Sequence, residues 1–499
     1  MRIRRMAAGA AVAGLVLAAS GCANDSRSAG DSGAGLNGPP AAAPKAPVRG
    51  VNSLAPDNDE FTSTFALDVD TASYGFVRRT LLDGSRPDPA TVRPEEFVNS
   101  FRQDYPQPRG SGFAVSVDGG RISSDVRMLR VGLQTREASQ GERRDARLTF
   151  VIDTSGSMSG PGRLDLVKES LRTLVRQLRP SDAVAIVAFT GTAETVLPMT
   201  PVAERARLLD AITRLRPGDS TNLGGGLVLG YKEARRGFAE GLTNRVILAS
   251  DGLANTGDTE SAPILRQVAD EARGDISLLC VGVGSDYGDT LMEQLADRGD
   301  GRALYVSEQS KADRLFVEQL PATVEVRAKD AKAQVKFDPE QVSAYRLIGY
   351  EDRKLNAEDF HDDGVDGGEI GPGHAVTALY TVRLKPDAAG HLGDVAVRWL
   401  DPDTGRPAET GHPITVSDTA PDLWSDAPVR LQVDAVAAYF AEHLKDVGVG
   451  HGTAFVTDGM LQGEPVVSLE LLRRQVETLA RKSEDKDVAD LSTLLSRAS

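Results

Sequence analysis

Three short segments of the chain carry carboxylate and hydroxyl side chains of the kinds that bind a hard metal ion. Asp153, Ser155 and Ser157 lie close together in the first, where the intervening glycine lets the backbone turn. Thr221 lies in the second and Asp251 in the third. Oxygen ligands of this kind suit Mg²⁺, Mn²⁺ or Ca²⁺ rather than zinc. The residues therefore predict a divalent metal site, with Mg²⁺ preferred, at which a carboxylate from a partner completes the ligand shell.

Apolar strands and a helix must position these segments. The apolar run at 148–152 leads directly to Asp153, and the run at 246–248 leads to Asp251. Thr221 lies in a glycine-rich loop ahead of a helix. In open α/β sheets, ligands bind at the carboxyl ends of the strands. We therefore expect the five side chains to meet at one sheet edge.

The segment 144–320 alternates strand and helix patterns. Further apolar runs at 184–189 and 276–283 suit strands that are buried on both faces. Between the first two strands, apolar residues from Leu164 to Leu178 recur at helical spacing. Repeated strand–helix alternation predicts a Rossmann-like α/β domain with a parallel sheet flanked by helices.

The central domain is inserted between β-rich segments. Residues 61–140 read as an α+β module, and 322–499 read as a β-rich and then helical domain, with helices near 433–444 and 469–480. The residues at 401–405 favour a hairpin turn. We expect the strands on either side of the central domain to form one sandwich that this domain interrupts.

The first residues resemble a bacterial lipoprotein signal. Arginines at the start precede an apolar stretch and small residues, and Cys22 would carry the lipid after cleavage of 1–22. An ordinary secretory signal with a chance cysteine remains the alternative. Residues 23–60 are rich in Gly, Ser, Ala and Pro, and predict a disordered tether. We expect a lipid-anchored protein of the bacterial cell membrane that faces away from the cytoplasm.

The metal-site motifs also resemble a known family. The sequence DTSGS, the loop Thr221 and the later SDG are similar to the adhesion-site motif of von Willebrand factor type A (vWA) domains. The resemblance implies that Ser155, Ser157 and Thr221 coordinate the ion directly or nearly so, and that Asp153 and Asp251 act directly or through water. FALDVDTASYGFVRR and the segment 348–380 resemble the bacterial YfbK-like group of vWA lipoproteins. Such a site implies a protein partner that offers an Asp or Glu carboxylate.

Charge and composition argue against some classes of function. The net charge of -15 argues against nucleic acid as a partner. All 6 histidines lie outside 144–320, and the serines lack a GxSxG context, so we expect no enzyme. The preferred hypothesis is an envelope protein that binds its partner through the metal. A structural scaffold with a non-engaging vWA domain is the alternative, and a metal-dependent hydrolase is a more remote one.

Some polar clusters have simpler interpretations. Asp68 and Asp70 are residue types that could bind a metal or act in acid/base chemistry, but we expect Asp70, with Thr71 and Ser73, to cap a helix, while Asp68 ends a strand. The acidic stretch 351–369 reads as a solvated loop, with calcium binding left open. Cys280 lies in an apolar run and reads as a core residue.

Overall fold

The fold described here is that of a computed structural model. It describes residues 61–67, 69–110, 112–137, 144–251, 261–272, 276–284, 289–299, 301–306, 326–365, 367–446, 464 and 466–498. The expected signal with Cys22, the expected tether, Asp68 and the last central helix expected near 312–320 lie outside these residues. All described residues belong to one compact unit, Val51–Ser499.

The central domain is built on a six-stranded sheet. Its strands are β4 (Ala146–Asp153), β5 (Ala183–Phe189), β6 (Ala193–Pro201), β7 (Thr243–Ser250), β8 (Ser277–Val283) and β9 (Arg302–Val306), in the order β6-β5-β4-β7-β8-β9. Five strands are parallel, whereas the edge strand β6 pairs antiparallel with β5. The predicted parallel-type sheet is therefore present, with one antiparallel strand at this edge. The short β5–β6 connection explains the difference, because a parallel strand would need a long crossover.

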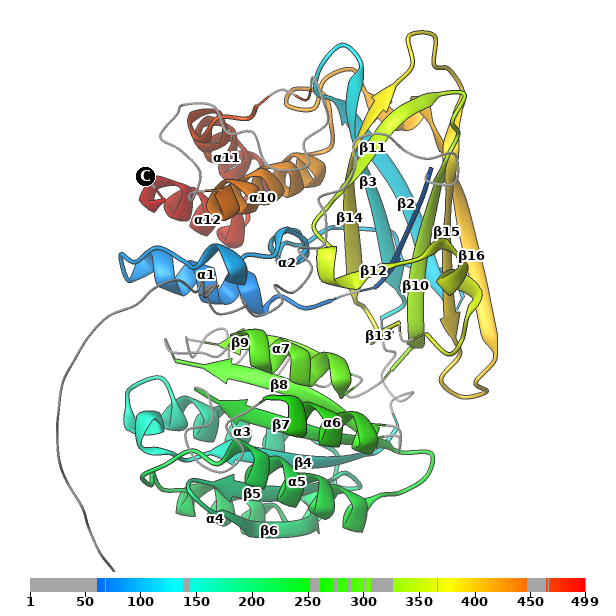
Figure 1. The fold of residues 1–499 in the computed structure, drawn as a ribbon. Helices are drawn as coiled ribbons and strands as arrows, with labels where there is room; N and C mark the ends of the chain where they lie inside the picture. Colours follow the sequence, from blue (N-terminus) through cyan, green and yellow to red (C-terminus); the bar gives the residue numbers. More distant parts are fainter. Residues whose placement is uncertain are drawn as a thin grey trace, which may run out of the picture. The chain divides into compact units, whose positions relative to one another are not determined.

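Helices cover both faces of this sheet (Figure 1). They are α3 (Leu164–Gln177), α4 (Arg205–Arg214), α5 (Leu223–Gly237), α6 (Ser261–Ala272) and α7 (Asp289–Arg298). Residues of α3 and α4 share one core with one sheet face, and residues of α5, α6 and α7 share a second core with the other. The stripe predicted between Leu164 and Leu178 is buried, and so is Cys280 in β8. This confirms the flanked α/β architecture.

Two sheets form a β-sandwich outside the central domain. The first contains β12 (Lys354–Leu355), β1 (Thr62–Ala66), β10 (Ala328–Phe337), β15 (His391–Leu400) and β16 (Pro407–Thr415), and β13 (Gly368–Ile370) pairs with β10. The second contains β11 (Val342–Ile348), β14 (Ala375–Leu384), β3 (Val126–Thr135), β2 (Phe113–Arg121) and β17 (Thr419–Ala420). Buried side chains from the two sheets share one core.

Strands from before and after the central domain pair with each other within the sandwich. β1 pairs with β10, and β3 pairs with β14. The predicted single sandwich interrupted by the central domain is therefore confirmed. The hairpin predicted at 401–405 is also present, since the Gly405 N–H donates to the Asp401 carbonyl at 2.8 Å between β15 and β16.

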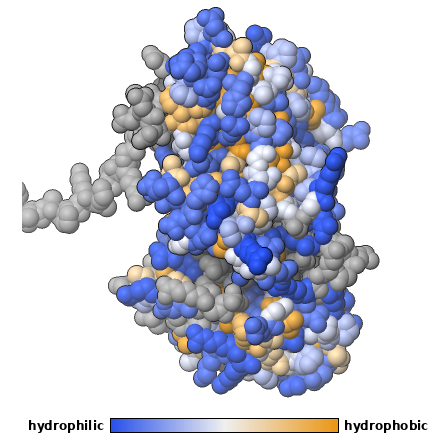
Figure 2. All heavy atoms as spheres, turned by 90° about the vertical axis from the view of Figure 1, so that its right-hand side faces the viewer, coloured by the Kyte–Doolittle hydropathy of each residue, from blue (hydrophilic) through white to orange (hydrophobic). Residues whose placement is uncertain are grey.

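Five helices pack on the outer face of the second sheet. They are α1 (Ala72–Leu82), α2 (Pro94–Asn99), α10 (Val429–Asp446), α11 (Leu469–Ser483) and α12 (Lys486–Arg497). Their apolar residues share a core with Met128, Ile348 and Leu379 of that sheet. A search of the described residues for a helix long and apolar enough to cross a membrane found none. On the face shown in Figure 2, hydrophilic side chains are interspersed with small apolar patches.

Asp70 ties the start of α1 to the central domain. Its Oδ1 accepts a hydrogen bond from the Ala303 N–H of β9 at 3.0 Å, and the Arg353 guanidinium lies 3.6 Å from Oδ2. Thr71 is the N-cap residue of α1 but makes no side-chain capping bond. The Ser73 N–H donates instead to Glu96 at 2.8 Å. The expected helix cap is therefore wrong, because the Asp70 carboxylate and the Ser73 N–H bond to residues far away in the chain instead.

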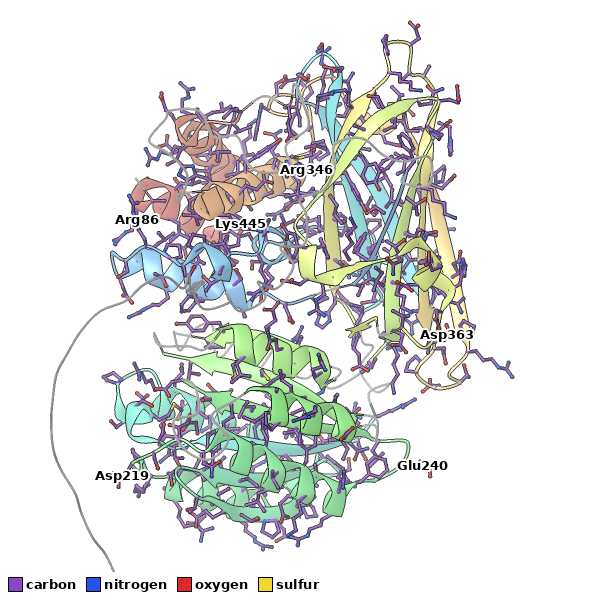
Figure 3. All side chains as sticks on the ribbon, in the orientation of Figure 1. Arg86, Asp219, Glu240, Arg346, Asp363 and Lys445 are labelled. Atoms are coloured by element: carbon purple, nitrogen blue, oxygen red, sulfur yellow. The ribbon has the colours of Figure 1, made fainter. Side chains whose placement is uncertain are left out.

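Carboxylates of the acidic stretch 351–369 pair with basic residues in different parts of the fold. Asp363 accepts from Arg398 at 2.8 Å, and Glu351 accepts from Lys445 at 3.0 Å. Figure 3 shows Asp363 and Lys445 on different parts of the fold. Within the part of the chain that the structure describes, no three His, Cys, Asp or Glu side chains group as a metal site would require. This geometry favours the loop interpretation over calcium binding.

The surroundings of His374 predict that the stability of the chain depends on pH. The Gly371 N–H donates to its Nδ1 at 3.1 Å, and the Arg302 guanidinium lies 3.2 Å from its Nε2. Burial and the charges of Arg302 and Arg245 lower the pKa of His374 well below its usual value. The unfolded chain takes up this proton near pH 6.5 and the folded chain does not, so stability is full above pH 6.5 and falls below it.

We therefore expect the wild type to lose up to about 1.4 kcal/mol more stability than His374→Gln between pH 7.5 and 5.5. Chemical denaturation at both pH values measures the difference. His412 is exposed, so His412→Gln is the control and should keep the wild-type dependence. Identical pH dependence in all three proteins would contradict this role of His374.

Candidate metal centre

Asp153 is the last residue of β4, in the middle of the central sheet. Its side chain is fully buried. The Ser155 N–H donates to Oδ1 at 2.8 Å, and the Ser250 hydroxyl donates to Oδ2 at 2.6 Å. Since β7 runs parallel to β4 and Ser250 ends β7, both strands deliver polar groups to the same sheet edge. The carboxylate is therefore held in one orientation.

Hydrogen bonds connect Asp153 to the two serines and to Asp251. The hydroxyl oxygens of Ser155 and Ser157 lie 2.9 Å apart. The Ser157 hydroxyl donates to Asp251 Oδ1 at 2.8 Å, and Asp251 directly follows β7. A 3-10 turn at Gly156–Ser159 brings Ser157 back over the strand end. Four of the five predicted residues thus form one hydrogen-bonded cluster at the carboxyl end of the sheet.

The loop that carries Thr221 is anchored beside this cluster. The Gly218 N–H donates to the Thr154 carbonyl at 2.6 Å, and the Asn222 N–H donates to the Thr190 carbonyl at 2.7 Å. A Cβ at Gly156 would lie 3.2 Å from the Gly218 carbonyl oxygen, so glycine permits this close approach. Thr221 is only 4% exposed.

Figure 3 shows the neighbouring Asp219 pointing outward at the rim of the domain. The loop therefore reaches the surface next to the buried Thr221. The structure thus brings the fifth residue to the same edge through its loop.

Two carboxylates lie close together in the site, and Arg163 provides a counter-charge to one of them, Asp251. Burial raises the pKa of Asp153, and the charge of Asp251 raises it further, while the hydrogen bonds from Ser250 and Ser155 oppose both effects. Asp251 is 1% exposed. Buried carboxylates are costly without a counter-charge, so a cation beside Asp153 would lower the cost of its ionised form.

Two residues of the site were missed by sequence reasoning. Ser250 holds Asp153, and its place immediately before Asp251 in the motif was an available signal. Arg163 precedes α3, and its Nη1 donates to Asp251 Oδ2 at 2.6 Å and to the Ser157 carbonyl at 3.0 Å. No spacing rule points to Arg163, because its contact with Asp251 joins residues far apart in the chain.

The residues present fit a hard divalent ion. The cluster offers hydroxyl and carboxylate oxygens and has no nitrogen or sulfur donor among its five members, which matches the ligands of Mg²⁺, Mn²⁺ and Ca²⁺. Asp153, Ser155, Ser157, Thr221 and Asp251 would hold the ion. When bound, such an ion supplies a positive centre that can accept a carboxylate oxygen.

Comparison with family models covers most of the described chain. Residues 148–319 match the von Willebrand factor type A domain, and 322–455 match the model described as "Uncharacterized protein YfbK, C-terminal". Residues 49–125 match a model described as von Willebrand factor. The matched central region contains all five residues of the cluster.

Individual proteins are also similar to parts of the chain. "Uncharacterized protein YfbK" of Escherichia coli is 34% identical over 407 residues, which cover 76% of this chain and 70% of the relative. Inter alpha-trypsin inhibitor heavy chain 4 of Mus musculus is 30% identical over 169 residues, covering 32% of this chain and 18% of that protein. A solved von Willebrand factor type A protein from Catenulispora acidiphila has a TM-score of 0.48 at 16% identity, covering 78% of this chain and 91% of that chain. The chain belongs to the YfbK family, and it contains both a vWA domain and the YfbK carboxy-terminal domain.

Proposed function

We propose that the chain is a lipid-anchored envelope protein that binds a protein partner through a divalent metal at the vWA site. The observation that carries the proposal is the hydrogen-bonded cluster of Asp153, Ser155, Ser157 and Asp251 at the carboxyl end of the sheet. vWA domains commonly mediate protein–protein interactions through such a site, which supports partner binding as the general role. A carboxylate from an Asp or Glu of the partner is the natural further ligand for a hard ion.

The chemistry of the cluster supports binding rather than catalysis. A general base is commonly a histidine, yet every histidine lies outside the segment 144–320. The Ser155 and Ser157 hydroxyls contact each other, and Ser157 also contacts Asp251, whose carboxylate pairs with Arg163. We therefore propose no enzymatic role.

Attachment through Cys22 and a location outside the cytoplasm are part of the same proposal, and their support is the signal-like sequence of the first residues. Lipid attachment would hold the vWA domain at a membrane surface. Mass spectrometry of the amino-terminal peptide from membrane fractions would detect the modified cysteine.

Capture of the partner should depend on both the metal and Thr221. We expect the immobilised chain to retain one set of envelope proteins in Mg²⁺ and to release them in EDTA. Thr221→Ala should retain at least tenfold less of these proteins, because the loss of a ligand weakens the binding of the metal ion. Thr213 is exposed on α4, so Thr213→Ala is the matched control and should behave as the wild type. Quantitative mass spectrometry of the retained proteins measures the effect. Retention of the same proteins in EDTA, or by Thr221→Ala, would sink the proposal.

A further inference from the structure

Arg163 pairs with Asp251, a carboxylate that a metal ion bound at the cluster would also need. Its guanidinium forms an ion pair with Asp251 at 2.6 Å, and the same nitrogen donates to the Ser157 carbonyl at 3.0 Å. The Arg163 side chain is 16% exposed and that of Asp251 is 1% exposed. The pair is therefore largely shielded from water. In such a shielded position, the attraction between two opposite charges is stronger than at the protein surface.

We propose that Arg163 is an internal cation of the site, which neutralises Asp251 in the metal-free chain and must release it when a divalent ion binds. The inference rests on the proposed metal site and adds the residue that regulates it. Both cations need the same carboxylate, whose Oδ1 already accepts from Ser157 and whose Oδ2 accepts from Arg163. Arg163 therefore weakens metal binding and keeps the site neutralised at low metal concentration.

The backbone beside Arg163 is shaped to hold the side chain in this position. Gly284 follows β8 with a φ of +82°, and a Cβ there would lie 2.8 Å from Arg163 Nε and 3.3 Å from its Cδ. The Tyr305 hydroxyl donates to the Gly284 carbonyl and fixes this backbone from β9. Only glycine leaves room for the arginine at this point. The fold thus provides a specific place for the side chain next to the cluster.

The competition can be measured with Mn²⁺ alone as the probe. Free Mn²⁺ is counted by electron paramagnetic resonance while it is titrated into the purified full chain. We expect Arg163→Gln to lower the dissociation constant for Mn²⁺ roughly tenfold, because one shielded ion pair and one repulsive charge are removed. Arg176 is exposed on α3, the helix that follows Arg163, so Arg176→Gln removes the same charge and should bind Mn²⁺ as the wild type does.

A second variant and a second readout guard against a folding defect. Arg163→Lys keeps the charge but loses the planar guanidinium, so its Mn²⁺ affinity should lie between those of the wild type and Arg163→Gln. Without metal, Arg163→Gln should unfold at a lower temperature than the wild type. Saturating Mn²⁺ should raise the unfolding temperature of Arg163→Gln by more than it raises that of the wild type.

The possible failures can be told apart. Equal or weaker Mn²⁺ binding by Arg163→Gln, together with clear binding by the wild type, would overturn the role of Arg163 and leave the metal site standing. No Mn²⁺ binding by either protein would overturn the metal site itself. Binding by Arg163→Gln alone would support the internal cation in its strongest form.

Discussion

Replacing Asp153 with alanine is expected to abolish the stabilisation of the chain by Mg²⁺. At a free Mg²⁺ concentration one hundred times the dissociation constant, the wild type should gain about 2.7 kcal/mol of unfolding free energy. The variant should gain none, because Asp153 contacts Ser155 and Ser250 and so organises the cluster. Thermal unfolding with and without Mg²⁺ measures the difference.

A second buried aspartate of the same sheet provides the control for Asp153→Ala. Asp182 accepts from the Ala146 N–H at 2.7 Å and from the Arg179 N–H at 2.7 Å, near the opposite ends of β4 and β5. Asp182→Ala should lower the stability of the metal-free protein yet keep the full response to Mg²⁺. An undiminished response in Asp153→Ala would contradict the assignment, and no response in the wild type would favour a scaffold with a non-engaging domain.

Removal of Asp434 is expected to have the largest effect on stability. Asp434 of α10 is fully buried and accepts from Arg130 of β3 at 2.9 Å and from Gln103 at 2.8 Å. Burial raises its pKa to about 6, although Arg130 and Gln103 oppose the shift, so it is ionised at pH 7.5. Asp434→Ala leaves the buried Arg130 with a partly exposed partner, Asp118, and should cost about 3–5 kcal/mol.

Tryptophan fluorescence during denaturation at pH 7.5 measures this cost, because both tryptophans, Trp399 and Trp424, lie outside the central domain. Asp83 serves as the control. It pairs with Arg79 on the surface of α1, where both side chains are about 40% exposed, so Asp83→Ala should cost no more than about 1 kcal/mol. Equal costs for the two variants would show that the buried network does not hold α10 on the sandwich.

The central sheet and most of the site could be predicted because their signals are local. Strands buried on both faces appear as continuous apolar runs, and two of these runs lead to site residues. Asp153 and Asp251 follow such runs directly, so the parallel pairing of β4 and β7 brings them together. The order of the motifs then predicted the remaining residues of the candidate site, including Thr221.

Long-range contacts explain what could not be predicted. The antiparallel edge strand β6 follows β5 closely and has no distinctive pattern of its own. The local sequence predicts that Asp70 caps a helix, yet its carboxylate accepts a hydrogen bond from a backbone N–H of β9. No local pattern marks Arg163, yet it pairs with Asp251. In each case, the partner lies on another element, and its position is set by the assembled fold.

The central claim is that the five residues bind one divalent ion. Anomalous scattering from crystals of the chain soaked in Mn²⁺ tests it most directly, because the map locates the ion without reference to any activity. The account predicts one strong peak among the oxygens of Asp153, Ser155, Ser157, Thr221 and Asp251, with Arg163 withdrawn from Asp251. A map from well-soaked crystals with no peak at this cluster, or with Mn²⁺ bound only elsewhere, would contradict it.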